Sequence, residues 1–227
     1  MKALLRAFAA MTMATTALGQ AGSAGSTSPA GGAAITAEFT NPALNPAEWT
    51  LTIQPDGSAH FHSQAGQTAS GDSPSIELPA IDRDVSLSAA FAQRLFSAAR
   101  RHNWFNQECE SRAKVAFQGW KKLSYSGPEG SGACKFNYSK DREIQDLGDD
   151  LLAVAETILE GEKLEMLLSH DRLGLDQEIA YLSQAVQGGQ AQQVCAIRQV
   201  LEKLAGDDQV LERVRKQARV LLTLAEP

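Results

Sequence analysis

Residues 48–63 read EWTLTIQPDGSAHFHS, and they decide the fold prediction because they describe a complete β-hairpin. Trp49, Leu51 and Ile53 alternate with polar residues, which is the period of a strand with one buried face. The PDG turn follows, in which proline fixes φ and glycine accepts a positive φ. A second alternating run with Phe61 then returns. The sequence therefore predicts an antiparallel hairpin near the start of the ordered chain.

The segments after the hairpin predict a small antiparallel sheet with one packed helix. Residues 75–81 suggest a third strand, which its proline confines to the sheet edge. Residues 86–105 have the apolar period of an amphipathic helix. Two more strands, near residues 120–125 and 134–138, flank the turn SGPEGSG. We therefore expect an α+β domain over residues 47–160.

The pattern changes to helix only after Asp141. The first apolar helix face is expected to break at Gly161, and three shorter amphipathic helices follow. Two of these helices are expected to end at Gly188 and Gly206. Short loops between helices favour antiparallel neighbours. We therefore expect residues 161–227 to form a helical bundle or a helical-repeat-like region.

The first residues have the pattern of a secretory signal peptide. Lys2 and Arg6 give a positive region, an uncharged apolar run follows, and Ala17 and Gly19 are small residues suited to cleavage. The apolar run is too short for a membrane-spanning helix. We therefore expect residues 1–19 to be a signal peptide and the protein to be periplasmic or secreted.

Residues 20–46 begin with a run of Gly, Ala and Ser, which predicts a flexible linker. The formal charge of the chain is −6, and loss of the signal peptide would make it two units more negative. An acidic surface repels phosphate backbones, so we expect no nucleic-acid partner. No later run is apolar enough to predict a membrane span.

The three cysteines are Cys109, Cys134 and Cys195, so at least one is unpaired. Cys109 and Cys134 fall in the same predicted domain, and exported proteins mature where thiols oxidise. We therefore expect a disulfide between these two, with three free thiols as the alternative. Cys195 is expected beside an apolar helix face as a small hydrophobe. As a nucleophile it would need a base, and His170 is the nearest histidine in sequence.

His60 and His62 are the candidate metal ligands. They are two residues apart on a predicted strand, so both side chains point to one face. Imidazoles at that spacing bind zinc or copper, but a site needs further ligands that the sequence does not place. The alternative is a polar strand face in contact with water. We therefore predict no cofactor.

Two other groups have both a functional and a structural interpretation. Asp146, Asp149 and Asp150 lie near a helix start, where the helix dipole favours acids without any cation, and the spacing of a calcium loop is missing. Residues 116–127 (AFQGWKKLSYSG) mix aromatic and basic residues as nucleic-acid surfaces do, but in an acidic chain a strand is the better interpretation. The sequence has no phosphate loop, dinucleotide fingerprint, nucleophile elbow or zinc-protease helix.

The element order over residues 49–158, with its PDG turn, resembles an uncharacterised α+β domain of exported bacterial proteins. That resemblance implies no activity. The final segment DDQVLERVRKQARVLL resembles the second helix of a HEAT-type repeat through Val214 and Arg215 followed by Ala218. A solenoid needs three or more stacked units, and the sequence shows no second copy.

Two functions of different classes are consistent with these patterns. The first, which we favour, is a non-catalytic exported module that binds another exported protein or a cell-envelope component through its helical end or a sheet edge. The alternative is a hydrolase or metal-dependent enzyme with a site built around His60 and His62.

Overall fold

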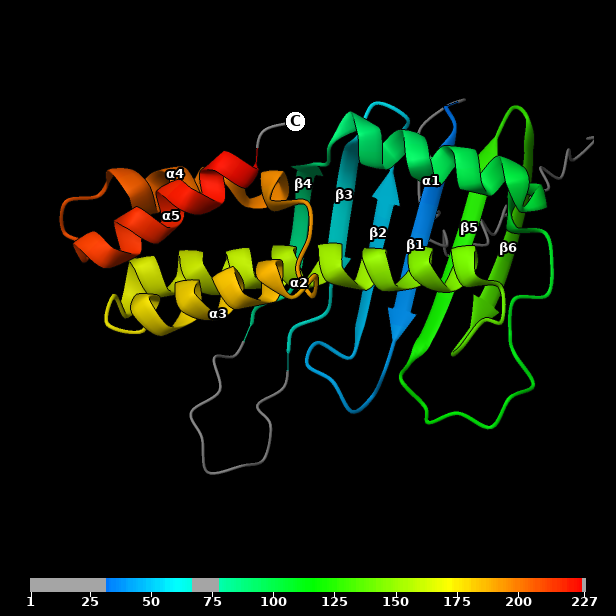
Figure 1. Cartoon of the computed structure of the whole chain (residues 1–227), viewed down its shortest axis with the longest axis horizontal. Helices are drawn as coiled ribbons and strands as arrows, with labels where there is room; N and C mark the ends of the chain where they lie inside the picture. Colours follow the sequence, from blue (N-terminus) through cyan, green and yellow to red (C-terminus); the bar gives the residue numbers. More distant parts are fainter. Residues whose placement is uncertain (1–31, 67–77, 226–227) are drawn as a thin grey trace, which may run out of the picture. The chain divides into compact units, whose positions relative to one another are not determined.

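The computed structural model describes residues 32–66 and 78–225, so the predicted signal peptide and the start of the predicted linker lie outside the described residues. A six-stranded antiparallel sheet and a helical C-terminal region confirm the expected α+β class (Figure 1). The strands are β1 (Ala34–Thr40), β2 (Glu48–Ile53), β3 (Ser58–Ser63), β4 (Ile81–Ser86), β5 (Trp120–Gly127) and β6 (Gly130–Phe136). The helices are α1 (Ala89–Arg101), α2 (Arg142–His170), α3 (Leu175–Gln187), α4 (Arg198–Gly206) and α5 (Glu212–Leu224), with 3₁₀ segments η1 (Asn103–Phe105) and η2 (Val194–Ile197).

The hairpin predicted over residues 48–63 forms β2 and β3. Its turn closes as the PDG sequence requires. Gly57 has a φ of +88°, and the Gln54 backbone N–H donates to the Ser58 oxygen at 2.8 Å. A Cβ on Gly57 would lie 2.5 Å from the Leu87 carbonyl oxygen. Glycine is therefore needed here both for the backbone conformation and for the close approach of the chain that follows β4.

The prediction of a flexible linker over residues 20–46 is wrong for its second part, because Ala34–Thr40 forms β1 in the interior of the sheet. Ile35, Ala37 and Phe39 point into the core and are at most 3% exposed. These apolar residues alternate with polar ones as in any half-buried strand. The run is short and follows a Gly/Ala-rich stretch. It becomes a strand because β2 and β5 pair with it on both sides.

The strand order β4-β3-β2-β1-β5-β6 leaves two edges. The edge strand expected over residues 75–81 begins only at Ile81. That strand, β4, carries charged residues, which discourage pairing with another chain. The other edge, β6, is packed by the segment around η1, where Gly132 lies so close to the Trp104 carbonyl oxygen that a Cβ would be 2.6 Å from it. Neither edge offers a free apolar ladder for strand addition.

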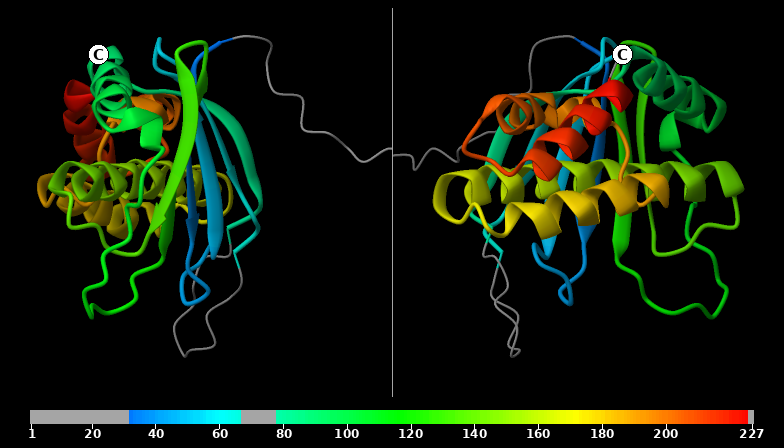
Figure 2. Two further views of the ribbon diagram at one scale, coloured as in Figure 1. Left: turned by 90° about the vertical axis from the view of Figure 1, so that its right-hand side faces the viewer. Right: turned by 60° about the vertical axis from the view of Figure 1, so that its left-hand side comes forward.

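The helices α1 and α2 lie on one face of the sheet, and no described element covers the other face (Figure 2). Both helices begin at side-chain caps. The Phe91 N–H donates to Ser88 Oγ at 3.2 Å, and the Glu143 N–H donates to Asp141 Oδ1 at 3.0 Å. The sheet thus has one buried apolar face and one face open to water, as antiparallel sheets commonly do.

The boundary expected at Gly161 is wrong, because α2 continues through it to His170. With 29 residues, α2 is about 43 Å long, whereas six strands span only about 24 Å between the outermost two. The helix therefore runs past β4 and carries α3, α4 and α5 beyond the sheet (Figure 1). Gly161 permits close packing instead of a break, since a Cβ there would lie 2.3 Å from Ile197 Cγ2.

The two expected domains are not separate units. The chain forms one compact unit, Gly31–Pro227, which contains two apolar cores. The first core fills the space between the sheet, α1 and the first part of α2, and it ends along α2 at Leu159. The second begins at Leu164 and fills the helical end. Polar contacts join the two parts, including the Thr157 hydroxyl, which donates to the Gln192 carbonyl oxygen at 2.6 Å.

Cys109 and Cys134 form the disulfide in the structure, with their Cα atoms 5.6 Å apart. Cys134 lies on β6, and Cys109 lies in the segment between η1 and β5. The bridge closes a loop with a sequence separation of 25 residues. It therefore fixes the irregular segment that follows η1 to the edge of the sheet.

Replacement of Gly161 by valine should lower the free energy of unfolding by about 1–3 kcal/mol, because the new side chain has to displace Ile197. Thermal and urea unfolding would measure this change. The control is Gly206→Val on α4, where nothing lies within 4 Å of the added Cβ. Equal stability of the two variants would contradict the packing assigned to Gly161.

The protein, purified without reductant, should be lighter by the mass of two hydrogen atoms than its reduced form. The Cys109→Ala/Cys134→Ala variant should lose about 3–4 kcal/mol of stability, because a bridge of this span restricts the unfolded chain. Intact-mass measurement and urea unfolding test both expectations. A Cys195→Ala variant is the control and should keep the mass difference.

Candidate functional site

The irregular segment of residues 106–119 leads from η1 to β5 and passes below the lower ends of β5 and β6 in Figure 1, as a green loop. It has no regular structure, but hydrogen bonds hold it. The Gln118 N–H donates to Asn137 Oδ1 at 2.7 Å, and Asn137 Nδ2 donates to the Ala116 carbonyl oxygen at 3.2 Å. The Ser111 N–H donates to the Tyr138 carbonyl oxygen at 2.8 Å. The loop therefore lies fixed beside the chain that follows β6.

The base of this loop is held by a covalent bond and a carboxylate. Cys109 is bonded to Cys134 at one side, and the next residue, Glu110, accepts a hydrogen bond from the Asn137 N–H at 2.6 Å. At the other end Gly119 has a φ of +115°, and a Cβ there would lie 2.4 Å from the Phe39 ring. Both ends of the loop are thus held close to the sheet.

Apolar side chains of this region remain in contact with water. Val115 is 43% exposed, Phe117 52%, and Trp120 and Tyr138 are each 37% exposed. The Phe117 and Trp120 rings meet edge to face at 5.8 Å, and the Lys135 amine lies 4.8 Å from the Trp120 ring centre. Exposed apolar groups that gather in this way mark interaction surfaces more often than scattered ones do.

The cations beside these side chains have no acidic partner. Arg112, Lys114, Lys135 and Lys140 are exposed, and no carboxylate of the described residues lies within 4 Å of them. Apart from Lys216, every other Lys and Arg in the described chain has such a carboxylate. We call this surface the basic aromatic patch. It comprises Arg112, Lys114, Val115, Phe117, Trp120, Lys135, Tyr138 and Lys140.

The patch is positive although the chain is acidic. Residues 111–140 contain six Lys or Arg and a single acid, Glu129, whereas the whole chain has a formal charge of −6. Glu129 is itself paired, at 3.1 Å, with Arg100. The patch therefore presents a local positive potential that attracts anionic partners and weakens with salt.

Residues 116–127, which form part of this region, are predicted from the sequence to be a strand. That prediction is correct for β5. It does not identify the exposed residues before β5 and after β6 as part of a surface. Their exposure and their lack of acidic partners depend on how the loop lies. The excess of Lys and Arg over acids in residues 111–140 is the signal that would have indicated the patch from the sequence.

His60 and His62 both lie on the open face of the sheet, as their spacing predicts, and the register places an aspartate opposite each. His60 Nδ1 is 2.8 Å from Asp84 Oδ1, and His62 Nδ1 is 3.1 Å from Asp82 Oδ2. His60 Nε2 is also 3.3 Å from Asp82 Oδ1. Both histidines therefore contact carboxylates across the strand pair, an arrangement that suits a solvated polar face.

The described part of the chain contains no group of three or more His, Cys, Asp or Glu side chains that could hold a metal ion. His60 and His62 have only Asp82 and Asp84 close by, and those carboxylates are widely exposed. Among the same residues, no helix has the length and apolar character needed to cross a bilayer.

The three aspartates near the start of α2 point to separate partners. Asp146 lies 3.8 Å from Arg142, Asp149 lies 3.4 Å from Lys121, and Asp150 lies 2.6 Å from Arg94. They do not converge on one point where a cation would bind. Their positions agree with the structural interpretation, in which acids pair locally near the helix start.

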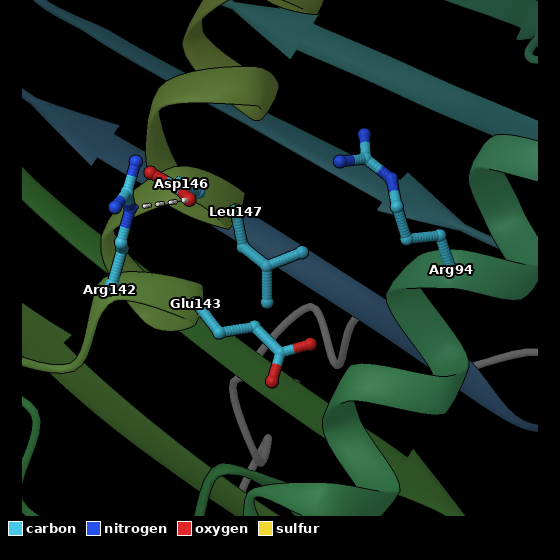
Figure 3. A pocket seen from close by; sticks show the side chains of 5 residues that line it. All are labelled: Arg94, Arg142, Glu143, Asp146 and Leu147. Atoms are coloured by element: carbon cyan, nitrogen blue, oxygen red, sulfur yellow. Dashed lines mark ion pairs between the residues drawn. The ribbon is translucent and has the colours of Figure 1, made fainter.

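A groove of about 330 Å³ lies between α1 and α2, lined by Arg94, Arg142, Glu143, Asp146 and Leu147. Figure 3 shows Leu147 between the two helices and the Glu143 carboxylate pointing toward α1. Hydrogen bonds from Arg101 and His102 lower the pKa of Glu143 to about 2. The charged groups of this groove are therefore paired, unlike the cations of the basic aromatic patch.

Cys195 is half-buried at η2, and burial raises the pKa of its thiol. The thiol donates a weak hydrogen bond to Gln193 Oε1 at 3.8 Å. His170 ends α2 and makes no described contact with Cys195. Among the residues that the structure describes, no histidine or carboxylate is hydrogen-bonded to this thiol.

Glu160 is fully buried on α2, where Lys163 donates to its carboxylate. Lys163 also lies 3.6 Å from Glu178 on α3. Burial, together with the hydrogen-bonded Glu178, raises the pKa of Glu160 to about 9. Two carboxylates here share one amine, so the neutral form of Glu160 is favoured. This group therefore bears on the stability of the helical end.

No protein-family model matches the chain, and no curated protein matches it in sequence. Function therefore has to be inferred from the residues themselves.

Replacement of Glu160 by glutamine should remove a pH-dependent part of the stability. Because the folded-state pKa is raised, Glu160 favours folding at low pH, and that contribution is lost as the pH rises above about 4.3, the unfolded-state value. Glu160→Gln should therefore gain stability over the natural protein from about pH 5 to about pH 8, by at most about 1.4 kcal/mol per pH unit. Urea unfolding at several pH values measures the difference.

The matched control is Glu156→Gln, one turn earlier on α2, where the carboxylate accepts a hydrogen bond from the Tyr181 hydroxyl at 2.9 Å. That variant should track the natural protein as the pH changes. If the difference in free energy of unfolding between Glu160→Gln and the natural protein stayed constant with pH, the assignment of a neutral, buried Glu160 carboxyl group would be refuted.

Proposed function

We propose that the protein is a non-catalytic exported module that binds an anionic component of the cell envelope through the basic aromatic patch. The observation behind this proposal is that, among the described residues, exposed cations without acidic partners lie beside exposed aromatic side chains on the loop of residues 106–119 and at the adjoining ends of β5 and β6. Arg112 and Lys114 precede Val115 and Phe117 on this loop, and Lys135 lies over Trp120. Such a surface combines electrostatic attraction with apolar contact, the two contributions that a binding site for a charged, partly apolar partner needs.

Export is supported by two observations. The signal-peptide pattern of residues 1–19 lies outside the described residues and rests on the sequence alone. The Cys109–Cys134 bridge is the independent structural support, because disulfides persist in oxidising compartments. A periplasmic or secreted location would place the patch next to envelope components.

The held loop favours binding over catalysis. Asn137, Glu110 and the disulfide hold the loop in place, so little conformational freedom is lost when a partner binds. The sheet edges expected as binding sites are covered or charged. The helical end expected as an alternative surface has exposed Val220 and Leu224 on α5 beside Lys216. It can therefore be tested directly against the patch.

Envelopes isolated from the source organism should retain the mature protein at low salt and release it at high salt. Arg112→Glu/Lys114→Glu should lose most of this retention, because charge reversal turns attraction into repulsion. Lys216→Glu, which reverses the unpaired cation on α5, should be retained like the natural protein. Co-sedimentation followed by gel densitometry measures all three.

If Lys216→Glu lost retention and the double variant kept it, the binding surface would be the helical end. Absence of retention for the natural protein at low salt would reject the proposed function altogether. Circular dichroism of each variant confirms that the fold is intact before the comparison.

A further inference from the structure

We infer that the anionic component is the surface of a lipid bilayer, and that Val115 and Phe117 enter its outer apolar layer while the cations of the patch lie among the headgroups. This inference rests on the proposed function and names the partner of the same surface. It concerns peripheral association, in which no segment crosses the membrane.

The order of residues along the loop suits this arrangement. Arg112 and Lys114 flank the exposed Ala113, and Val115 follows Lys114 directly, with Phe117 two residues further on. Lysine and arginine side chains reach headgroup phosphates while their aliphatic stems lie along apolar surface. Anionic lipids attract clustered cations of this kind, and nearby apolar side chains add affinity by leaving water.

Trp120 stands where an interfacial residue is expected. It lies at the start of β5, is 37% exposed, and touches both Phe117 and the Lys135 amine. Tryptophan prefers the headgroup region of membranes because its ring is apolar and its N–H is polar. An indole at the base of the loop would therefore sit at headgroup depth while Phe117 lies deeper.

The apolar part of the surface distinguishes a bilayer from a soluble polyanion. Val115 has no aromatic ring that could stack on a base or sugar. The same holds for Leu44, which is 53% exposed on the β1–β2 loop at the same end of the sheet. Asn41 joins the two loops, since its Nδ2 donates to the Gln118 carbonyl oxygen at 3.1 Å. Aliphatic side chains gain from acyl chains, whereas a hydrophilic polymer offers them little.

The test uses the mature protein with vesicles of phosphatidylcholine, either pure or mixed with phosphatidylglycerol. We expect sedimentation with the mixed vesicles, little with the pure ones, and reduced binding at high salt. Tryptophan emission should shift to the blue on binding, because the Trp120 indole would leave water. The change can be assigned to Trp120, since Trp49 is buried and Trp104 is stacked on Tyr125 at 4.4 Å. Lipids brominated in the acyl chain should quench that emission.

Two pairs of variants separate the contributions of the patch. Arg112→Ala/Lys114→Ala should weaken partitioning roughly 30-fold, from about fivefold per cation. Phe117→Ala should weaken it roughly tenfold. The matched controls on α5 are Lys216→Ala, an unpaired cation, and Leu224→Ala, an apolar residue that is 58% exposed against 52% for Phe117. Both controls should partition like the natural protein.

The inference fails if the natural protein does not sediment with the mixed vesicles at low salt, or if the α5 controls lose as much binding as the patch variants. It also fails if a soluble anionic polymer, with heparin as the probe, binds as well as vesicles do and Phe117→Ala has no effect. If the protein does not sediment with vesicles, or binds heparin equally well, retention on whole envelopes that is lost in Arg112→Glu/Lys114→Glu would still support the proposed function with a different anionic component. Loss of retention on envelopes as well would reject both.

Discussion

One helix, α2, has to bury two different apolar faces, and the rest of the structure depends on this constraint. Its first part packs on the sheet through Ile144, Leu151 and Ile158, all at most 1% exposed. Past Gly161 it contributes Leu164 and Leu167 to the helical end. Because a helix is a stiff rod, burying both faces fixes where the helical end begins relative to the sheet. Gly161 lies where the two cores meet, and Ile197 packs against its bare backbone.

The position of α2 also determines which surfaces stay open. With α1 and α2 on one face, the other face keeps mostly polar and charged groups, and neighbouring strands pair several of those charges with one another. Lys122 lies 2.5 Å from Glu38 across β1 and β5, and His62 faces Asp82 across β3 and β4. Charges that are matched in this way offer little net attraction to an ion.

The basic aromatic patch differs in that its charges are not matched. Lys121 is buried beside it and is satisfied, because its amine donates to the Asn137 carbonyl oxygen at 3.3 Å and lies 3.4 Å from Asp149. Arg112, Lys114 and Lys140 are exposed and have no such partner in the part of the chain that the structure describes. In a chain with a formal charge of −6, this concentrates positive potential at the lower ends of β5 and β6. The disulfide and Asn137 then hold the exposed rings in place.

Local chemistry by itself determined the hairpin and the amphipathic helices, and the number and placement of the cysteines favoured the pairing of Cys109 with Cys134 over three free thiols. Each depends on residues that are close in sequence or on a simple count. Tertiary structure decided the rest, because the determining neighbours lie far along the chain. Residues 34–40 become a strand only when β5 pairs beside β2, and Gly161 continues a helix because Ile197 needs its space. The cations of residues 112–140 form one surface only because Asn137 holds the loop against the end of the sheet.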